Sequence, residues 1–537
     1  MSEIELSFNA KTKPSSNKIL FALAAKIKRP AEKIKEFEVV KRSLDARMGK
    51  VVYRYRVRYR LAGEQPLERF ELKPYLNVAD AADSVEEVVI IGCGPAGLFA
   101  ALTLLQRGIK PIILERGKDV RTRKIDNATM CRSSVVTPDS NYCFGEGGAG
   151  TYSDGKLYTR STKRGNVEEV LATFVKFGAA PDIMIETHAH IGSDRLPAII
   201  ENMRKKIVEC GGEVHFNTRV TDISATELND GKRWIISAGE KIFKSDNIIL
   251  ATGHSARDIY EMFYEKGWAL EAKGFALGVR VEHPQKLINR IRYRNNDDPS
   301  LPVAEYSAVA QVNGRGVFSF CMCPGGVLVP AATAPGEIVL NGMSNSARSS
   351  RLANAGVVVS VNPDDVKDNP SCKDGDPLKL LRFQKRIEQH LFECGDGSLK
   401  APAQRMTDFV NNRMSANLPA SSYLCGVYSA PLHTMLPKFI VEALQKGFIE
   451  FDKKLKGYYT KDALLVATES RTSSPVRIPR NPNTLEHIDL PGLYPCGEGA
   501  GYAGGIVSSA IDGINAARMI SEKLTINYKR FLNRKGG

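Results

Sequence analysis

Three glycines mark the first chemistry that the sequence suggests. Gly92, Gly94 and Gly97 lie in EEVVIIGCGPAGLFAALTLL, after one apolar run and before another. This spacing, between a buried strand and a helix, lets the backbone approach a pyrophosphate and directs free helix amides toward it. A second predicted strand ends at Glu115, whose carboxylate can accept hydrogen bonds from ribose hydroxyls. We therefore predict a dinucleotide-binding turn here.

The same glycine spacing recurs twice, from Gly145 to Gly150 and from Gly499 to Gly504. The first copy follows polar residues instead of an apolar strand. After the second copy too little chain remains for another βαβ unit. Neither copy has the complete context of a nucleotide-binding turn, so we expect only the pattern at Gly92 to act as one.

Three later segments indicate that the dinucleotide is FAD, because an FAD domain is commonly interrupted and its last strand returns near the end of the chain. GGEVHFNTRVTDI is typical of the adenine pocket, SDNIILATGHSARD of a strand and turn that cross near the dinucleotide, and GLYPCGEGAGYAGGIVSSAIDGINAA of a strand, glycine-rich turn and helix. In the last segment Glu498 is expected by the ribityl chain. The residues predicted to bind FAD are Gly92, Gly94, Pro95, Ala96, Gly97, Glu115, Arg116, Gly148, Lys156, Val220, Ala251, Thr252, Gly253, Gly497, Glu498, Gly504, Gly505 and Ile506.

Catalytic side chains are harder to find, because a flavin performs its own hydride and electron chemistry. Cys321 and Cys323 lie in FCMCPGG, where a thiolate could face the flavin as a redox partner or acid, or both could be small buried side chains. Lys156 could place positive charge beside the reduced flavin with Asp154 holding it, or the two could form an ordinary loop ion pair. We predict Cys321, Cys323 and Lys156 as the catalytic candidates.

Further charged residues are weaker candidates. Arg280, Glu282 and His283 end a predicted strand and could reach a substrate carboxylate or pair with each other. Arg471 and Arg477 flank a turn where an anionic ligand or the pyrophosphate could bind. We predict no metal site, since the remaining cysteines and the eight histidines form no second ligand pair at a zinc-like spacing.

Composition and pattern predict an α/β protein. A content of 43% hydrophobic and 25% charged residues excludes disorder, and ten scattered cysteines with no secretory leader indicate a cytoplasmic protein without a disulfide framework. No segment is expected to span a membrane. We predict a Rossmann-like FAD/NAD(P)-binding domain that is discontinuous in sequence, with an inserted α+β substrate domain and a small N-terminal α+β domain. The predicted boundaries are residues 1–80 for the N-terminal domain, 86–265 and 466–525 for the FAD domain, 266–465 for the insertion and 526–537 for a basic tail.

Positive charge is concentrated near the N-terminus, where residues 1–60 hold 16 Lys and Arg against 6 Asp and Glu, which gives +10 of the total +15. In VVYRYRVRYRL, a strand would place Arg54, Arg56, Arg58 and Arg60 on one face. This face could bind nucleic acid or a phosphorylated partner, or it could be the solvated side of a sheet that packs its other face on a helix.

With these motifs in view, the chain resembles FAD-dependent oxidoreductases of the glutathione-reductase-like fold. More closely it resembles the NAD(FAD)-utilising or FAD-dependent dehydrogenases. The closer match rests on FGEGGAGTYSDGKLYTR at 144–160, ATGHSARD at 251–258, GFALGVRVEHPQ at 274–285, FSFCMCPGGVLVP at 318–330, NGMSNSARSSRLANAGVVVSV at 341–361, ESRTSSPVRIPR at 469–480 and GEGAGYAGGI at 497–506. The resemblance implies the fold and the cofactor, and it supplies no substrate.

We therefore predict an FAD-dependent oxidoreductase that transfers a hydride or electrons to or from a small-molecule substrate. Residues 260–460 contain no second strand, glycine turn and helix for NAD(P)H, so nicotinamide is expected to meet the flavin only transiently. The alternatives are a nucleic-acid-associated flavoprotein that uses the basic N-terminal domain and a flavin-based redox sensor.

Overall fold

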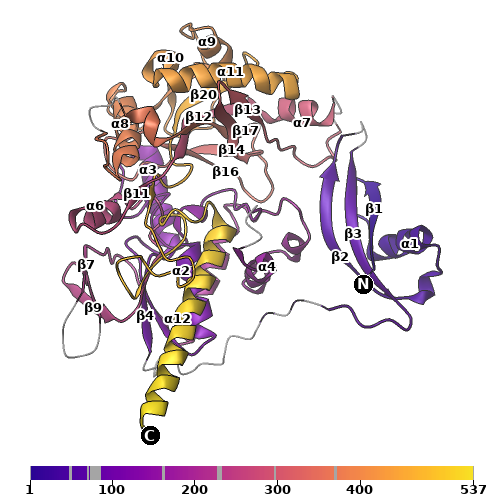
Figure 1. Ribbon diagram of the computed structural model, residues 1–537. Helices are drawn as coiled ribbons and strands as arrows, with labels where there is room; N and C mark the ends of the chain where they lie inside the picture. Colours follow the sequence, from indigo (N-terminus) through magenta and orange to yellow (C-terminus); the bar gives the residue numbers. More distant parts are fainter. Residues whose placement is uncertain are drawn as a thin grey trace.

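The computed structural model describes residues 2–47, 51–68, 70, 72, 86–159, 164–225, 233–294, 298–367 and 372–535. The sequence also predicts a short acidic linker from Asp80 to Glu87 and a polar loop from Pro363 to Pro377. Most of the linker and part of the loop lie outside the described residues. In Figure 1 the N-terminal unit stands beside the body of the molecule, the inserted domain forms the upper part and the last helix extends downward.

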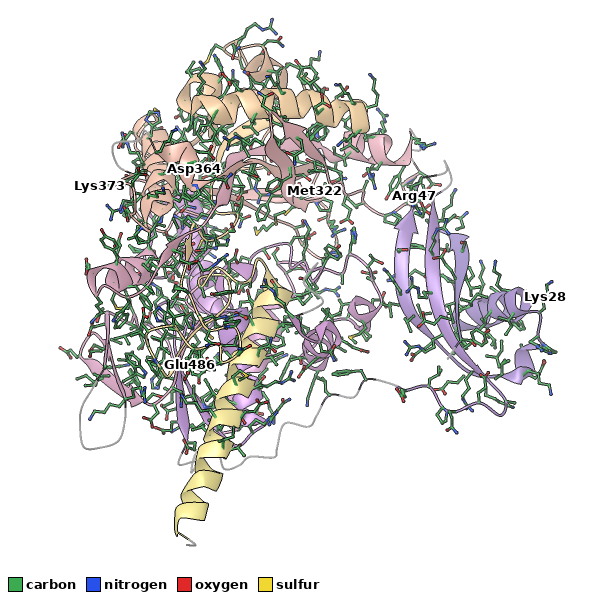
Figure 2. All side chains as sticks on the ribbon, in the orientation of Figure 1. Lys28, Arg47, Met322, Asp364, Lys373 and Glu486 are labelled. Carbon is green, nitrogen blue, oxygen red and sulfur yellow. The ribbon has the colours of Figure 1, made fainter. Side chains whose placement is uncertain are left out.

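The N-terminal unit is a three-stranded antiparallel sheet in the order β1-β3-β2, with one helix packed on it. Its elements are β1 (Ser2–Asn9), α1 (Ser16–Ile27), β2 (Ile34–Asp45) and β3 (Val52–Leu61). The predicted alternation along β3 is present, because Tyr55 and Val57 are buried with Leu23 of α1 in one apolar cluster. Lys28, at the end of α1, points away from the rest of the molecule (Figure 2).

The arginine face of β3 is covered by acidic residues of the neighbouring strands. Arg54 pairs with Glu5 and Asp45. Arg58 pairs with Glu3 and Glu38 in the same way. Because its cations already face carboxylates across the sheet, this face gives no support to the nucleic-acid alternative, and it has the charge pattern that stabilises cross-strand pairs.

A five-stranded parallel sheet in the order β22-β10-β4-β5-β6 forms the centre of the dinucleotide-binding part. Its strands are β4 (Glu87–Ile91), β5 (Lys110–Leu114), β6 (Glu213–His215), β10 (Ile248–Leu250) and β22 (Leu493–Pro495). The edge strand β22 comes from the far end of the chain, so the parallel sheet is discontinuous in sequence, as predicted. Together with the mixed sheet of the insertion, it confirms the predicted α/β fold class.

Helix α2 (Pro95–Leu105) follows β4 and is buried along almost its whole length. It packs against α12 (Ile506–Lys535), and the approach is close: a Cβ at Gly513 would fall 2.0 Å from the carbonyl oxygen of Ala96. Helix α12 runs on through the segment predicted as a basic tail. Helices α3 (Val120–Ser133), α4 (Val167–Lys176), α5 (Leu196–Glu209) and α6 (Arg257–Glu265) complete this part, with the small sheet β7 (Asp222–Ala225), β8 (Trp234–Ala238) and β9 (Lys241–Ser245).

The inserted domain is built on a seven-stranded sheet in the order β13-β14-β17-β12-β20-β18-β19, antiparallel except between β18 and β19. The strands are β12 (Phe275–Pro284), β13 (Val309–Val312), β14 (Arg315–Cys323), β17 (Leu352–Val361), β18 (Ala401–Arg405), β19 (Val427–Ser429) and β20 (Leu464–Glu469). The pair β15 (Val327–Pro330) and β16 (Leu340–Met343) lies beside it, while β11 (Glu271–Ala272) pairs with β21 (Val476–Arg477). The helices are α7 (Gln285–Tyr293), α8 (Lys379–Glu393), α9 (Met406–Val410), α10 (Leu432–Met435) and α11 (Lys438–Lys454).

The sequence also predicts strands over 303–312 and 337–340 in this domain, and both differ in the structure. The strand predicted over 303–312 is reduced to β13, because the amides of Ala304 and Ala308 donate to the side chains of Asn289 and Ser319 instead of to a neighbouring strand. The strand predicted over 337–340 begins only at Leu340 and continues as β16. Within the described part of the chain, no helix combines the length and the apolar character that crossing a bilayer requires.

Candidate active site

A cavity of about 690 Å³ opens at the carboxyl ends of β4, β5, β10 and β22. This is the edge of a parallel sheet where nucleotide ligands bind, and the volume is in the usual range for ligand pockets. Its wall combines the dinucleotide turn with Ser319, Phe320 and Cys321 of the inserted strand β14. Of the residues predicted to bind FAD, the cavity brings together Gly92, Gly94, Pro95, Ala96, Glu115, Arg116, Gly148, Lys156, Val220, Ala251, Thr252, Gly253, Gly497, Glu498, Gly504, Gly505 and Ile506.

Two glycines of the turn are needed for close packing of the backbone. At Gly92, where φ is +108°, a Cβ would lie 2.4 Å from the carbonyl oxygen of Ala251. At Gly97, a Cβ would lie 2.0 Å from the carbonyl oxygen of Gly92, so Gly97 holds α2 against the turn and does not line the cavity. Gly94 is the N-cap of α2 and provides no side-chain cap, which leaves amides of the first turn available to a phosphate.

Three other cavity glycines face open space. A Cβ at Gly253, Gly504 or Gly505 would meet no protein atom within 4 Å. A side chain at these positions would project into open space at the cavity wall. Glycine there keeps room for a ligand against the backbone, and together with the uncapped start of α2 these residues fit an extended dinucleotide such as FAD.

The carboxylate of Glu115 is fixed at the end of β5. It is buried and accepts backbone hydrogen bonds from Cys93 at 2.8 Å, Gly117 at 2.9 Å and Gly145 at 3.0 Å. Since a carboxylate has about four acceptor positions, one remains for a ribose hydroxyl. Arg116 also lines the cavity, but its guanidinium is bound to Asp139 and Asp258.

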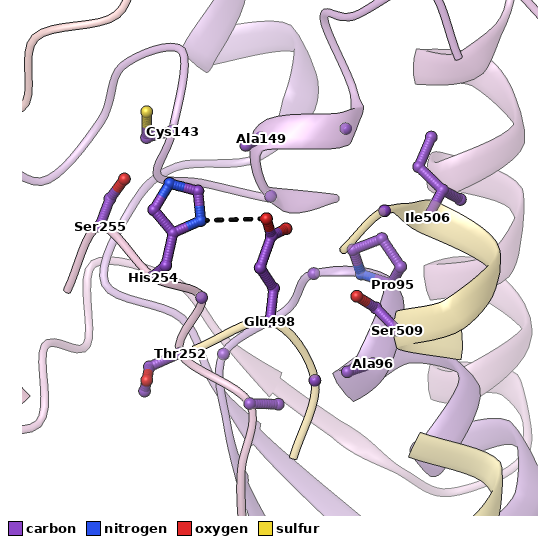
Figure 3. Close-up of a pocket in the computed structure, with 18 of the residues that line it drawn as sticks. Pro95, Ala96, Cys143, Ala149, Thr252, His254, Ser255, Glu498, Ile506 and Ser509 are labelled. Carbon is purple, nitrogen blue, oxygen red and sulfur yellow. Dashed lines mark ion pairs between the residues drawn. The ribbon is translucent and has the colours of Figure 1, made fainter. Parts of the chain in front are cut away.

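His254 is a cavity residue that the sequence analysis missed. Its Nδ1 lies 3.3 Å from an Oε1 of Glu498, and the pair points into the cavity in Figure 3. The other ring nitrogen, Nε2, is buried and has no hydrogen-bond partner among the residues that the structure describes. The only signal in the sequence was its position directly after Gly253 in the turn of ATGHSARD.

Lys156 and Asp154 lie on the side of the cavity that faces the inserted domain. The Lys156 Nζ donates to the carbonyl oxygen of Met322, a residue labelled in Figure 2. The same Lys156 Nζ lies 3.9 Å from a carboxylate oxygen of Asp154. The Asp154 side chain is only 1% exposed and accepts no hydrogen bond from a described residue. Burial alone would lower the pKa of Lys156, but the negative charges of Cys321, Cys323 and Asp154 raise it above its usual value.

Cys321 and Cys323 lie at an irregular end of β14. The pairing of β14 with β17 shifts register between Phe320 and Cys323, and Cys321 has a φ of +40°, which is unusual for a residue other than glycine. Cys321 lines the cavity, whereas Cys323 is fully buried behind it. A hydrogen bond from Cys323 lowers the pKa of Cys321 despite burial, with help from the charges of Lys156 and Arg280.

The prediction that Arg280, Glu282 and His283 face a substrate or pair with each other is wrong. None of them lines the cavity, because β12 lies inside the seven-stranded sheet and is buried on both faces. Arg280 forms an ion pair with Glu469, Glu282 accepts from Ser421 and Ser422, and His283 Nε2 bonds the carbonyl of Tyr458.

The two arginines predicted for an anionic ligand also have other roles. Arg471 borders the cavity, but its guanidinium is already bound to Glu337, Glu388 and Thr333. Arg477 is outside the cavity lining and pairs with Glu271 at 3.4 Å. Within the described residues, no group of three or more His, Cys, Asp and Glu side chains is arranged to hold a metal ion.

Comparison with known proteins shows which families the chain matches. Residues 86–262 match the model of the pyridine nucleotide-disulphide oxidoreductases, residues 274–472 that of the FAD-dependent protein, C-terminal domain-like family, and residues 1–60 a domain of unknown function, DUF8436. An uncharacterized protein of Clostridium beijerinckii is 42% identical over 520 residues, which cover 94% of this chain and 96% of that protein.

Solved flavoprotein structures are much less similar. Thioredoxin reductase of Lactococcus lactis is 20% identical over 31% of this chain and 35% of its own, with a TM-score of 0.18. A geranylgeranyl bacteriochlorophyll reductase-like protein of Thermoplasma acidophilum is 12% identical over 84% of each chain, with a TM-score of 0.33. We draw no conclusion from likeness at this level.

The matched domains and the cavity define the class: this is an FAD-dependent oxidoreductase with FAD as its cofactor. Within that class, the chain belongs to the same family as the Clostridium beijerinckii protein.

Proposed function

We propose that this oxidoreductase transfers a hydride or electrons between FAD and a small molecule that binds against the inserted domain. The observation that carries the proposal is the shared cavity: Ser319, Phe320 and Cys321 of β14 border the same space as the dinucleotide turn. A substrate held there would lie next to the cofactor. Asn341 of β16 and Tyr158, which is 54% exposed, add polar groups and an aromatic ring to this wall.

The protein's own groups would place the substrate and balance charge. FAD supplies the hydride or electron chemistry when it is bound. Lys156, held by the Met322 carbonyl, would stabilise negative charge that develops on the cofactor or substrate. Cys321 would serve as an acid or redox partner on the cavity wall, with Cys323 behind it.

The same arrangement bears on how a nicotinamide donor would reach the flavin. The described part of residues 260–460 forms the mixed sheet and helices of the inserted domain, with no second parallel nucleotide-binding sheet. We propose that NADH or NADPH, where it is the donor, enters the open cavity transiently.

The test is an absorbance spectrum of the purified protein, followed by anaerobic titration with NADH and then NADPH. Bleaching of a bound flavin band supports a reductase in which nicotinamide reaches the ring. A bound flavin that stays oxidised would indicate that the substrate or a protein partner is the reductant.

Turnover is the second part of this test. Sustained turnover with any donor and acceptor excludes the redox-sensor alternative. Protein that binds no flavin after refolding with FAD would contradict the proposal.

A further inference from the structure

The backbone around Cys321 is held in an uncommon conformation by buried polar groups. Its carbonyl oxygen accepts a hydrogen bond from Arg280 Nη1 at 2.9 Å and one from the Cys323 thiol at 3.4 Å. Arg280 is itself fixed by Glu469 and by the side chains of Asn341 and Asn354. A left-handed residue other than glycine persists only where its surroundings enforce it, and such residues concentrate at functional sites.

This conformation brings two cysteines together. In a regular strand, residues two apart are separated by about 6.6 Å, near the upper limit of the roughly 4.4–6.8 Å between Cα atoms that a disulfide spans. The left-handed turn at Cys321 and the register shift beside it contract the strand at this point. The Cys323 thiol lies 3.4 Å from the carbonyl oxygen of Cys321, so its sulfur is turned toward that residue.

The surroundings also favour thiol chemistry. Two cations, Lys156 and Arg280, act on Cys321, and a nearby positive charge favours the reactive thiolate. Cys321 lines the cavity and can be reached from it, whereas Cys323 is 0% exposed and does not line the cavity. All ten cysteines are free thiols in this structure.

We propose that Cys321 and Cys323 form a reversible dithiol–disulfide couple on the wall of the flavin cavity, and that the substrate class is a low-molecular-weight disulfide or thiol. This inference rests on the proposed function for the position of the flavin. Oxidation breaks two S–H bonds, forms one S–S bond and releases two protons and two electrons, which bound oxidised FAD or a disulfide substrate accepts. With a disulfide substrate, the Cys321 thiolate attacks one sulfur and releases the first substrate thiol. Cys323 then attacks Cys321 and releases the second.

The experiment uses the full-length protein and glutathione disulfide as the probe. After exposure, free thiols are alkylated and the peptide that contains both cysteines is weighed. We expect this peptide to escape alkylation, to be lighter by two hydrogen atoms, and to recover both thiols with dithiothreitol. In Cys323→Ser, which cannot close the bond, we expect glutathione to remain attached to Cys321. Alkylation of both cysteines in the treated wild-type protein, or glutathione retained without an internal disulfide, would overturn the proposal.

A reductive titration separates this inference from the proposed function. Wild-type protein with FAD, first oxidised by glutathione disulfide and freed of it, should take up two electrons more per chain than Cys321→Ser treated in the same way, because that variant can form neither the internal disulfide nor a mixed disulfide at the cavity wall. Cys394→Ser, which removes an exposed cysteine elsewhere, should titrate like the wild type. Failure to bind FAD contradicts the proposed function but leaves the thiol experiment readable. Bound FAD with equal electron uptake in wild type and Cys321→Ser contradicts only the dithiol couple.

Discussion

Two charged clusters lie where the flavin-binding part meets the inserted domain. They differ in whether their buried polar atoms have close hydrogen-bond and ion-pair partners. The arginine cluster consists of Arg257, Arg471, Glu337 and Glu388. Arg257 donates to Glu337 at 2.8 Å and to Glu388 at 2.7 Å, and Arg471 donates to the same two carboxylates at 3.0 Å and 3.1 Å. Each buried charge in this cluster therefore has a geometrically good partner.

The thiol cluster consists of Asp154, Lys156, Cys321 and Cys323. Here the carboxylate oxygens of Asp154 are buried and accept no hydrogen bond from the described part of the chain. Two cationic nitrogens lie 3.7 Å and 3.9 Å from one of these oxygens, and Cys321 has a left-handed backbone. Buried groups left in this state cost stability. The contrast indicates that the arginine cluster joins the two parts of the protein, while the thiol cluster is arranged for chemistry.

The largest effect is expected from removing one member of the arginine cluster. Glu388→Ala leaves Arg257 and Arg471 with one buried carboxylate between them, and breaking such a buried pair costs roughly 3–5 kcal/mol. Glu393→Ala, at the exposed end of the same helix, removes a surface pair with Arg386 and should cost at most about 1 kcal/mol. The midpoints of denaturant unfolding, followed by circular dichroism, measure the loss of stability in both variants. Equal midpoints for Glu388→Ala and Glu393→Ala would show that the arginine cluster is not needed for stability.

The same carboxylate should make stability depend on pH. Although burial opposes ionisation, Arg257 and Arg471 lower the pKa of Glu388 to about 2. An acid whose pKa is lower in the folded than in the unfolded protein stabilises the fold above its unfolded pKa. This contribution is lost as the pH falls through the folded pKa. The stability gap between wild type and Glu388→Gln should therefore narrow as the pH drops from about 4.5 to about 2. A gap that stays constant over this range in unfolding curves would show that Glu388 is not held ionised.

In the thiol cluster, Lys156→Met should leave stability nearly unchanged and slow the alkylation of Cys321. A nearby opposite charge shifts a pKa by about 1 to 3 units, so we expect a loss of roughly tenfold or more in the rate near pH 7. Iodoacetamide labelling followed by mass spectrometry of the Cys321 peptide gives this rate. Lys205→Met, which changes a half-exposed lysine on α5, is the matched control and should label at the wild-type rate. Equal alkylation rates of Cys321 in Lys156→Met and wild type would show that Lys156 does not activate this thiol.

Asp154→Asn should have the smallest effect, and its sign should be opposite. The Asp154 charge raises the pKa of Cys321, so its loss should speed alkylation by a few-fold at most. Stability should hardly fall, because no hydrogen bond to the carboxylate is lost. If labelling instead slows, Asp154 supports the thiolate only by holding Lys156 in place.

The sequence predicted those parts of the site that one local segment determines. The turn from Gly92 to Gly97 could be identified because its three glycines, strand and helix are contiguous. The other two glycine patterns lack that context. Gly148, which lies within the first of them, is nevertheless predicted to bind FAD, and it lines the cavity.

Long-range packing decided what the sequence could not show. Arg280, Glu282 and His283 look like the accessible end of a strand, but β12 lies between β17 and β20 and has no exposed face. The arginine cluster was missed because its four members come from four distant segments that only the fold brings together. His254 carried no pattern of its own beyond its place after Gly253.

The central claim is that the glycine-lined cavity holds FAD, and Gly504 tests it most directly. A Cβ at Gly504 meets no protein atom within 4 Å, so Gly504→Val should fold like the wild type and place its side chain in the space for the cofactor. Equilibrium binding of FAD, measured by flavin fluorescence on the refolded chains, should show one site in the wild type and a strong loss of affinity in Gly504→Val at unchanged thermal stability without cofactor. Equal FAD affinity in the two proteins would contradict the account.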